Sequence, residues 1–105
     1  MNVGEVWGVK FPFDDEPSKF KFRPCIIIDV DKLEVLSVKV TTHTPRDEFD
    51  IPILNWRRAK LRDPSYARIS KSIQIPKSSF VVKYGDIHKD DFDKIIETYV
   101  KFNSQ

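Results

Sequence analysis

The sequence predicts a small, mainly β fold with one C-terminal helix, arranged as a mixed β-barrel or as an α+β fold. Several short segments between residues 4 and 84 carry β-branched and aromatic residues at strand spacing, and loops rich in proline and acid separate them. An apolar run from Cys25 to Ile28 is too short for a buried helix and rich in isoleucine, which indicates a central strand. Only the segment from Lys89 to Phe102 has helical spacing of its apolar residues.

Bulk composition is that of an ordinary globular protein. The chain has 105 residues, 40% of them hydrophobic and 32% charged, with a formal net charge of +2. One cysteine excludes an internal disulfide and leaves too few thiols for a cysteine-based metal site. No apolar stretch approaches the length of a membrane span, and no secretion signal is evident at the N-terminus. We therefore expect one domain over residues 1–105, located in the cytoplasm and not bound to a membrane.

The first strand is expected from Gly4 to Phe11, followed by a loop over residues 13–19 that contains acids, proline and serine. The second strand is expected from Arg23 to Val30, with Pro24 as its first residue, where a missing N–H costs no ladder bond. Arg23 then lies at the mouth of a rigid strand, beside a charged loop. Such a fixed cation is a candidate for binding or catalysis.

The third strand is expected over Leu33–Thr42, after a tight turn at Asp31 and Lys32. Its residues alternate between apolar and polar, so its two faces should differ. The expected core face contains Leu36, Val38, Val40 and Thr42. The opposite face contains Ser37, Lys39 and Thr41, and we expect it to be open to solvent or to a ligand.

Further short segments are predicted between residues 49 and 84. Phe49, Ile51 and Ile53 alternate around Pro52, which indicates an edge strand. Residues 55–61 favour a short helical turn that stops before Asp63-Pro64. The remaining extended segments are Tyr66–Ile69, with Tyr66, Arg68 and Ser70 on one face, then Ser72–Ile75 and Ser79–Tyr84.

The C-terminal helix is predicted over Lys89–Phe102. Its expected buried stripe consists of Phe92, Ile95, Ile96, Tyr99 and Val100. Three acids, Asp90, Asp91 and Asp93, lie in the first turn, where the helix dipole favours negative charge. His88 is the expected N-cap, with Ile87 and Phe92 at the positions of a hydrophobic staple.

Motifs for cofactors and metals are missing. Three glycines in the whole chain provide neither a dinucleotide-binding nor a phosphate-binding loop. His43 and His88 have no nearby partners at metal-ligand spacing, and Cys25 lies inside an apolar run, where a thiol is inert. We therefore expect no cofactor and no metal. Chemistry by arginine, hydroxyl and carboxyl groups remains, or no chemistry at all.

Five stretches, in this order and spacing, together resemble the MazF/PemK family of toxin–antitoxin endoribonucleases: GEVWGVKFPFDD, KFKFRPCIIID, VKVTTHT, SYARISKSI and GDIHKDDFDKI. The resemblance covers nearly the whole chain. It implies an SH3-like small β-barrel with a C-terminal helix, usually as a homodimer. It also implies metal-independent cleavage of single-stranded RNA, leaving a cyclic phosphate and a 5′-hydroxyl, and a cognate antitoxin whose disordered tail lies along the active groove.

The resemblance also implies catalytic residues. The family's essential arginine falls on Arg23, its catalytic threonine or serine on Thr41, and a further arginine of some members on Arg68. Certain members carry an aspartate two residues after that second arginine, where this chain has Ser70. A mechanism that uses this acid as the general base therefore does not carry over.

The acid and base groups stay open. Asp15 and Glu16 lie in the loop beside Arg23, although acidic loops are usually just solvated, and Asp14, Asp15 or Glu16 could instead form a surface salt bridge with Arg23. His43 follows Thr41 closely and could act as acid or base, although a loop histidine is more often a plain surface residue.

Several residues are candidates for substrate binding. Lys19, Lys21 and Phe22, next to Phe20, alternate charges for phosphates with rings for bases, or form a loop whose rings pack on the barrel. Lys39 and Ser70 share the expected polar faces of Thr41 and Arg68. A basic cluster, namely Arg57, Arg58, Lys60 and Arg62, is a solvated patch able to meet RNA or an acidic antitoxin tail.

Two other functions remain open. Toxins of the same fold that poison gyrase bind a protein and cut no RNA, and fold alone does not decide function. A third alternative is an inactive member that acts as a binding module, which the departure at Ser70 favours.

Overall fold

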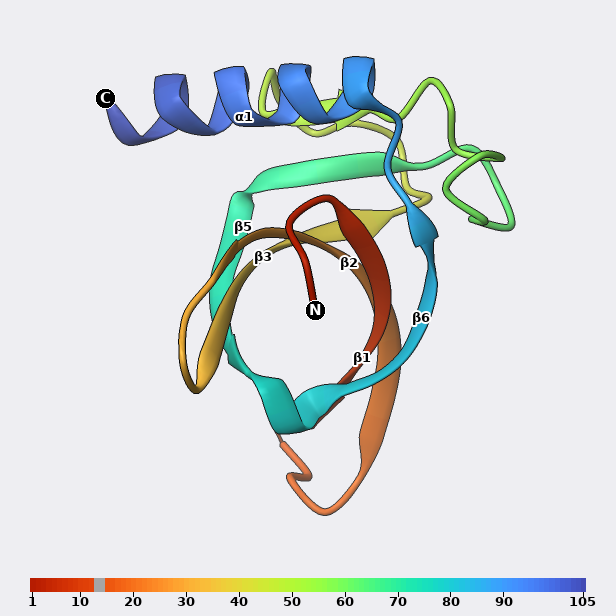
Figure 1. The fold of residues 1–105 in the computed structure, drawn as a ribbon, viewed down its shortest axis with the longest axis vertical. Coiled ribbons are helices and arrows are strands. Elements are labelled where there is room, and N and C mark those ends of the chain that lie inside the picture. The colour runs from red at the N-terminus through yellow and green to blue at the C-terminus, as the bar shows by residue number, and fades with distance from the viewer. Residues whose placement is uncertain (13–14) are drawn as a thin grey trace.

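One antiparallel sheet of six strands and a C-terminal helix make up the fold. The computed structural model describes residues 1–12 and 15–105, so the expected loop over residues 13–19 lies partly outside the described residues. The elements are β1 (Glu5–Pro12), β2 (Phe20–Val30), β3 (Glu34–Thr41), β4 (Asp50–Pro52), β5 (Tyr66–Pro76), the 3₁₀ helix η1 (Lys77–Ser79), β6 (Phe80–Asp86) and α1 (Lys89–Asn103). The strand order is β4-β5-β3-β2-β1-β6. In Figure 1 the strands curl into a ring, and α1 lies across one side of it, against β5. The predicted mainly β fold with a C-terminal helix is confirmed.

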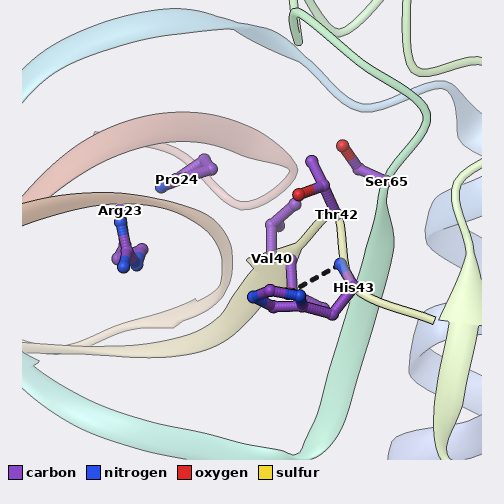
Figure 2. A pocket seen from close by; sticks show the side chains of 7 residues that line it. Arg23, Pro24, Val40, Thr42, His43 and Ser65 are labelled. Carbon is purple, nitrogen blue, oxygen red and sulfur yellow. Dashed lines mark hydrogen bonds between the residues drawn. The ribbon is translucent and has the colours of Figure 1, made fainter. Parts of the chain in front are cut away.

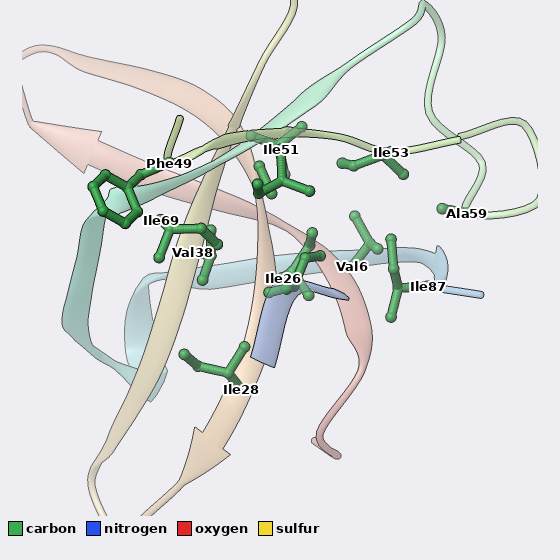
Figure 3. Packing of buried hydrophobic residues seen from close by; sticks show 13 residues of the cluster. Val6, Ile26, Ile28, Val38, Phe49, Ile51, Ile53, Ala59, Ile69 and Ile87 are labelled. Carbon is green, nitrogen blue, oxygen red and sulfur yellow. The ribbon is translucent and has the colours of Figure 1, made fainter. Parts of the chain in front are cut away.

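The sheet is buried on both faces along much of its length. One cluster lies between the sheet, α1 and the segment over residues 49–61, and Figure 3 shows its side chains. A second cluster lies on the opposite face of the strands. In β2, Ile26 and Ile28 belong to the first cluster, whereas Cys25 and Ile27 belong to the second. This burial on both faces explains the unbroken apolar run, and β2 is a central strand as predicted.

Strand β2 begins three residues earlier than predicted. Phe20, Lys21 and Phe22 are part of the strand and pair with β1, so they do not form a loop. Pro24 is correspondingly inside β2 and not at its first position. The missing N–H of Pro24 still breaks no hydrogen bond of the sheet. The Ile27 carbonyl points toward β1, where it accepts from the Gly4 amide, and the backbone groups of successive strand residues point to alternate sides. The Pro24 nitrogen therefore points toward β3, whose pairing with β2 has already ended.

Strand β3 shows which part of its predicted alternation holds. Val38 and Val40 are buried on one face, and Lys39 and Thr41 are half-buried on the other, as expected. The expectation for Ser37 is wrong: it is fully buried, because the curled sheet covers this face near the second cluster. The expectation for Thr42 is also wrong, since it lies beyond the end of β3 and is exposed.

Strand β4 is an edge strand, as Pro52 indicated. The two predicted segments Tyr66–Ile69 and Ser72–Ile75 form one continuous strand, β5, with a bulge between them. The register passes from Lys39 opposite Arg68 to Val38 opposite Ser72, so three residues of β5 have no counterpart on β3. Residues 55–61 form a series of hydrogen-bonded turns, and the Asn55 carbonyl accepts from the amides of Arg58 and Ala59, so one helical turn forms without continuing into a helix.

Helix α1 matches its prediction closely. His88 is the N-cap, and its Nδ1 accepts a hydrogen bond from the Asp90 amide at 3.1 Å. Val100, however, is 60% exposed and is not part of the buried stripe, since Thr98 and Phe102 face the sheet instead. Asp91 is buried and accepts hydrogen bonds from the backbone amides of residues 54 and 55, so it attaches α1 to the loop after β4. No helix among the described residues has the length and apolar character of a membrane span.

Glu5 is a buried carboxylate, 7% exposed, that joins β1 to β6. Its Oε1 accepts hydrogen bonds from Trp7 Nε1 at 2.9 Å and from the Asn2 amide at 3.0 Å, and its Oε2 lies 3.2 Å from Lys83 Nζ. Burial disfavours the charged carboxylate, but these donors outweigh burial and lower the pKa of Glu5 from 4.5 to about 2.

We expect Glu5→Gln to lower the melting temperature at pH 7 by about 5 °C. A depressed carboxyl pKa stabilises the fold above the unfolded value of 4.5, and this stabilisation is lost as the pH falls through about 2. Thermal melts of both proteins at pH 7, 4 and 2.5 measure the effect. The difference should shrink steadily toward low pH, and a difference independent of pH would contradict the assignment.

Candidate functional site

A hollow of about 520 Å³, here called the basic hollow, lies where β1, β2, β3 and β5 meet. Alternation along β2 and β3 places four of its lining residues, Lys21, Arg23, Lys39 and Thr41, on the same face of the sheet as the second core cluster. It is lined by Phe11, Lys21, Arg23, Lys39, Val40, Thr41, His43, Arg68, Lys71 and Ile73. Residues from four strands therefore converge on one concave surface.

A second hollow, here called the split, lies between β2 and β3. The two strands pair up to Cys25 opposite Lys39 and then separate. The space between them, about 240 Å³, is lined by Arg23, Pro24, Val40, Thr41, Thr42, His43 and Ser65. Figure 2 shows Val40, Thr42 and His43 together at the end of β3, with Arg23 and Pro24 across from them on β2.

The basic hollow is strongly positive. Five cations line it, namely Lys21, Arg23, Lys39, Arg68 and Lys71, and no carboxylate is present among its described lining residues. Phe11 adds one aromatic face, and Lys39 Nζ lies 4.9 Å from the centre of its ring. Clustered cations beside a ring suit a ligand that has phosphates and bases.

Arg23 is exposed, and its backbone is fixed because β2 pairs with β1 at Val9. Its Nη1 donates a hydrogen bond to the carbonyl of Phe22 at 3.3 Å. No ion pair to Arg23 occurs within the described chain, so a surface salt bridge to Asp15 or Glu16 is not formed, while Asp14, the third expected partner, lies outside the described residues. The guanidinium fork is therefore available to an anion in the hollow.

Thr41 and His43 form one small unit at the end of β3. The His43 amide donates a hydrogen bond to Thr41 Oγ1 at 3.2 Å, and Figure 2 shows this bond as a dashed line. Because Oγ1 acts as acceptor in this bond, the hydroxyl proton of Thr41 remains available for donation to a ligand. The bond also keeps the loop that carries His43 beside the hollow.

Arg68 forms an ion pair with Asp50, a residue outside the lining of the hollow that the sequence analysis did not identify. Asp50 lies opposite Arg68 in the pairing of β4 with β5, and its Oδ2 is 3.9 Å from Arg68 Nε. The side chains are 2% and 15% exposed, respectively. The same Oδ2 accepts a hydrogen bond from the Arg46 amide at 2.8 Å, so Asp50 also orders the turn that follows His43.

The structure thus brings together six of the predicted site residues: Lys21, Arg23, Lys39, Thr41, His43 and Arg68. It leaves the other five outside the hollows. Asp15 and Glu16 are exposed, and Lys19 forms an ion pair with Glu16 at 3.3 Å. Phe22 is on the opposite face of β2 from Arg23, because neighbouring strand residues alternate sides. Ser70 lies in the bulge of β5, away from the lining.

Lys71 and Ile73 are lining residues that sequence reasoning also missed. Simple alternation from Arg68 places both on the opposite face, with Ala67 and Ile69. Lys71 lies in the bulge itself, and the bulge changes the phase of β5, so that Ile73, opposite Ser37, returns to the face of Arg68. No local signal in the sequence marks this shift.

Cys25 is confirmed as an inert core residue. It is fully buried on the face of the second cluster, below the hollow. Burial raises the pKa of its thiol to about 12, against a small opposing effect of Lys39. The reactive thiolate form is therefore negligible at neutral pH. Across residues 1–12 and 15–105, no three His, Cys, Asp or Glu side chains gather closely enough to hold a metal ion.

Comparisons with known proteins give a family and a fold. Residues 2–101 match the family model described as PemK-like, MazF-like toxin of type II toxin–antitoxin system. No curated protein sequence matches. Among solved structures, an endoribonuclease in complex with its cognate antitoxin from Mycobacterial species is 13% identical, with a TM-score of 0.77 over 99% of this chain and 95% of that one. The Mycobacterium tuberculosis toxin MazF-mt6 is 16% identical, with a TM-score of 0.73 over 93% and 96%. At these identities the two structures show a shared fold.

Proposed function

This chain belongs to the family of PemK-like, MazF-like toxins of type II toxin–antitoxin systems, and we propose that it acts as an endoribonuclease on single-stranded RNA. The observation that carries this proposal is the basic hollow, where five cations surround a threonine hydroxyl on a paired sheet. Phosphodiester cleavage needs positive charge at the reacting phosphate, and arginine forks match two phosphate oxygens.

The proposed reaction is an internal transfer. The 2′-oxygen of a ribose attacks the adjacent phosphorus, a new O–P bond forms, and the bond from phosphorus to the 5′-oxygen breaks. The products are a cyclic phosphate and a 5′-hydroxyl. One proton must leave the 2′-hydroxyl and another must reach the departing 5′-oxygen, so the reaction needs no net supply of protons.

Each residue has a role that its surroundings support. Arg23 and Arg68 stabilise the negative charge that builds on the phosphate oxygens. The hydroxyl of Thr41 donates a hydrogen bond to one of these oxygens. His43 is our candidate for proton transfer, because it alone of the three proposed acid or base groups lines the hollow. Lys21, Lys39 and Lys71 bind neighbouring phosphates, and Phe11 provides a surface for a base.

Protein partners follow from the same family. We propose that a cognate antitoxin neutralises the chain with an acidic tail that occupies the basic hollow, and that both act in the cytoplasm.

We also propose that the chain forms a homodimer. Strand β6 supports this, because it is an edge strand of the sheet and its side chains Val81 and Val82 are 53% and 46% exposed, so that a second chain could cover them. Light scattering of the purified chain would test the dimer.

Incubation of the purified protein with a long single-stranded RNA in EDTA tests the proposal. We expect cuts at defined sites, with cyclic phosphate and 5′-hydroxyl ends when the fragments are mapped. A gel-shift assay with the same RNA separates binding from cleavage. Two results together would instead favour a protein target: the RNA stays intact under these conditions, and the chain remains toxic to cells after Arg23 and Thr41 are both substituted.

A further inference from the structure

A third hollow, here called the distal hollow, continues the groove beyond the split. Its volume is about 410 Å³, and it is lined by Pro24, Thr42, Lys60, Leu61, Arg62, Asp63, Ser65 and Tyr84. It shares Pro24, Thr42 and Ser65 with the split, which in turn shares Arg23, Thr41 and His43 with the basic hollow. The three hollows therefore form one path from β5, past the proposed catalytic residues, to β6.

The distal hollow differs in chemistry from the basic hollow. Its walls are largely apolar and come from Pro24, Leu61 and the ring of Tyr84, while two exposed cations, Lys60 and Arg62, stand at its rim with one acid, Asp63. Its volume is in the range of small-molecule pockets, about 300–1,000 Å³. An apolar wall with a tyrosine ring suits a nucleobase, and rim cations suit the phosphates on either side of it.

Two glycines allow the walls of this hollow to come together. A Cβ on Gly8 would lie 2.6 Å from the Tyr84 hydroxyl oxygen, so only glycine on β1 lets the end of the tyrosine ring lie this close to the strand. A Cβ on Gly85 would lie 2.7 Å from the Ala59 carbonyl oxygen and 2.8 Å from Lys60 Cγ. The turn that carries Lys60 is thus packed directly on β6, next to Tyr84.

Lys60 adds an independent observation. Its φ of +64° makes it the one non-glycine residue with positive φ among the residues that the structure describes. A lysine in the left-handed region costs free energy relative to glycine there, and such strain concentrates at binding and active sites. The amide of Lys60 donates to the Arg57 carbonyl and that of Leu61 to the Trp56 carbonyl, which holds this conformation in place.

We propose that the distal hollow binds the base of a nucleotide that flanks the cut in the same RNA strand, stacked on Tyr84, with Lys60 and Arg62 on its phosphates. This inference rests on the proposed function. The chain would then hold its substrate at two places, by charge in the basic hollow and by a base in the distal hollow. RNA too short to reach from the cut to Tyr84 would lose this second contact.

Three variants test the proposal on RNA whose cut has been mapped with the wild-type protein. Tyr84→Ala should raise KM about tenfold, which equals about 1.4 kcal/mol and lies within the range of base stacking on an aromatic ring, and leave kcat unchanged. Tyr84→Phe keeps the ring and should behave like the wild type. Lys60→Gly removes the charge and is compatible with the positive φ. RNA binding should become less dependent on salt, with the slope of log K against log salt reduced by about the value of one phosphate contact. Lys32→Ala, which removes an exposed lysine that lies outside the basic cluster and lines none of the three hollows, is the matched control.

Substrate length provides a second measurement. Oligonucleotides are shortened one residue at a time from each end toward the cut. Wild type and Tyr84→Ala should have equal KM values on the shortest cleaved RNA and differ only on RNAs long enough to reach the distal hollow. Normal wild-type cleavage with unchanged KM in Tyr84→Ala and Lys60→Gly would overturn the inference and leave the proposed function intact. The same unchanged KM combined with weaker antitoxin binding would assign the hollow to the antitoxin. No cleavage by the wild type would end both proposals.

Discussion

Arg23→Ala is expected to slow RNA cleavage about a thousandfold, with little change in the stability of the fold. Groups that stabilise charge in the transition state of phosphoryl transfer contribute factors of this size. The Arg23 side chain is exposed and has one hydrogen bond, to the Phe22 carbonyl. Its loss should therefore change the free energy of unfolding by no more than about 0.5 kcal/mol.

Arg23→Lys distinguishes charge from shape. Lysine keeps the positive charge and loses the planar fork that binds two phosphate oxygens, so cleavage should be intermediate between the wild type and Arg23→Ala. Single-turnover rates measure cleavage and thermal melts measure stability, with Lys32→Ala as the control for loss of an exposed cation. Equal rates for the wild type and Arg23→Ala would refute the role of Arg23.

Removal of the Asp50 carboxylate is expected to have the second large effect. Asp50 and Arg68 are both largely buried, and Arg68 Nε has no hydrogen-bond partner in the described chain besides this ion pair. Breaking a buried pair by removing one partner costs about 3 kcal/mol or more. Asp50→Ala should therefore destabilise the fold by about 3 kcal/mol, and Asp50→Asn should do so less, because its amide oxygen can still accept from the Arg46 amide.

Activity of the Asp50 variants tests whether this residue positions Arg68. Asp50→Asn should slow cleavage in the wild-type background and have no further effect in an Arg68→Ala background, since the two residues act as one unit. Asp47→Asn is the matched control, because Asp47 lies in the same turn and caps the Phe49 amide without contacting Arg68. Additive losses in the double variant would show that Asp50 acts on the fold alone.

Some residues of the candidate site can be predicted from the local sequence pattern, and others cannot. Alternation along β3 needs no knowledge of neighbouring strands, so the sequence predicts Thr41 and Lys39 on one face. The sequence also predicts Arg23 at the start of a rigid strand, because it directly precedes an apolar run. Lys71 was missed because the bulge in β5 reverses the alternation. Phe22 is expected in a loop because nothing in its own sequence shows that it pairs with another strand, whereas the structure pairs it with Lys10 of β1.

Elements whose cause is local can be derived from the amino-acid sequence. The central strand at Cys25–Ile28, the edge strand at Pro52 and the helix with its His88 cap all follow from periodicity, proline sterics and capping within a few residues. Three other features follow from the assembled sheet and not from local sequence: the register that sets Asp50 against Arg68, the burial of Ser37 and the packing of Gly8 against Tyr84. These features depend on which strands become neighbours when the sheet curls, and contacts between residues far apart in the chain leave no periodic trace near either one.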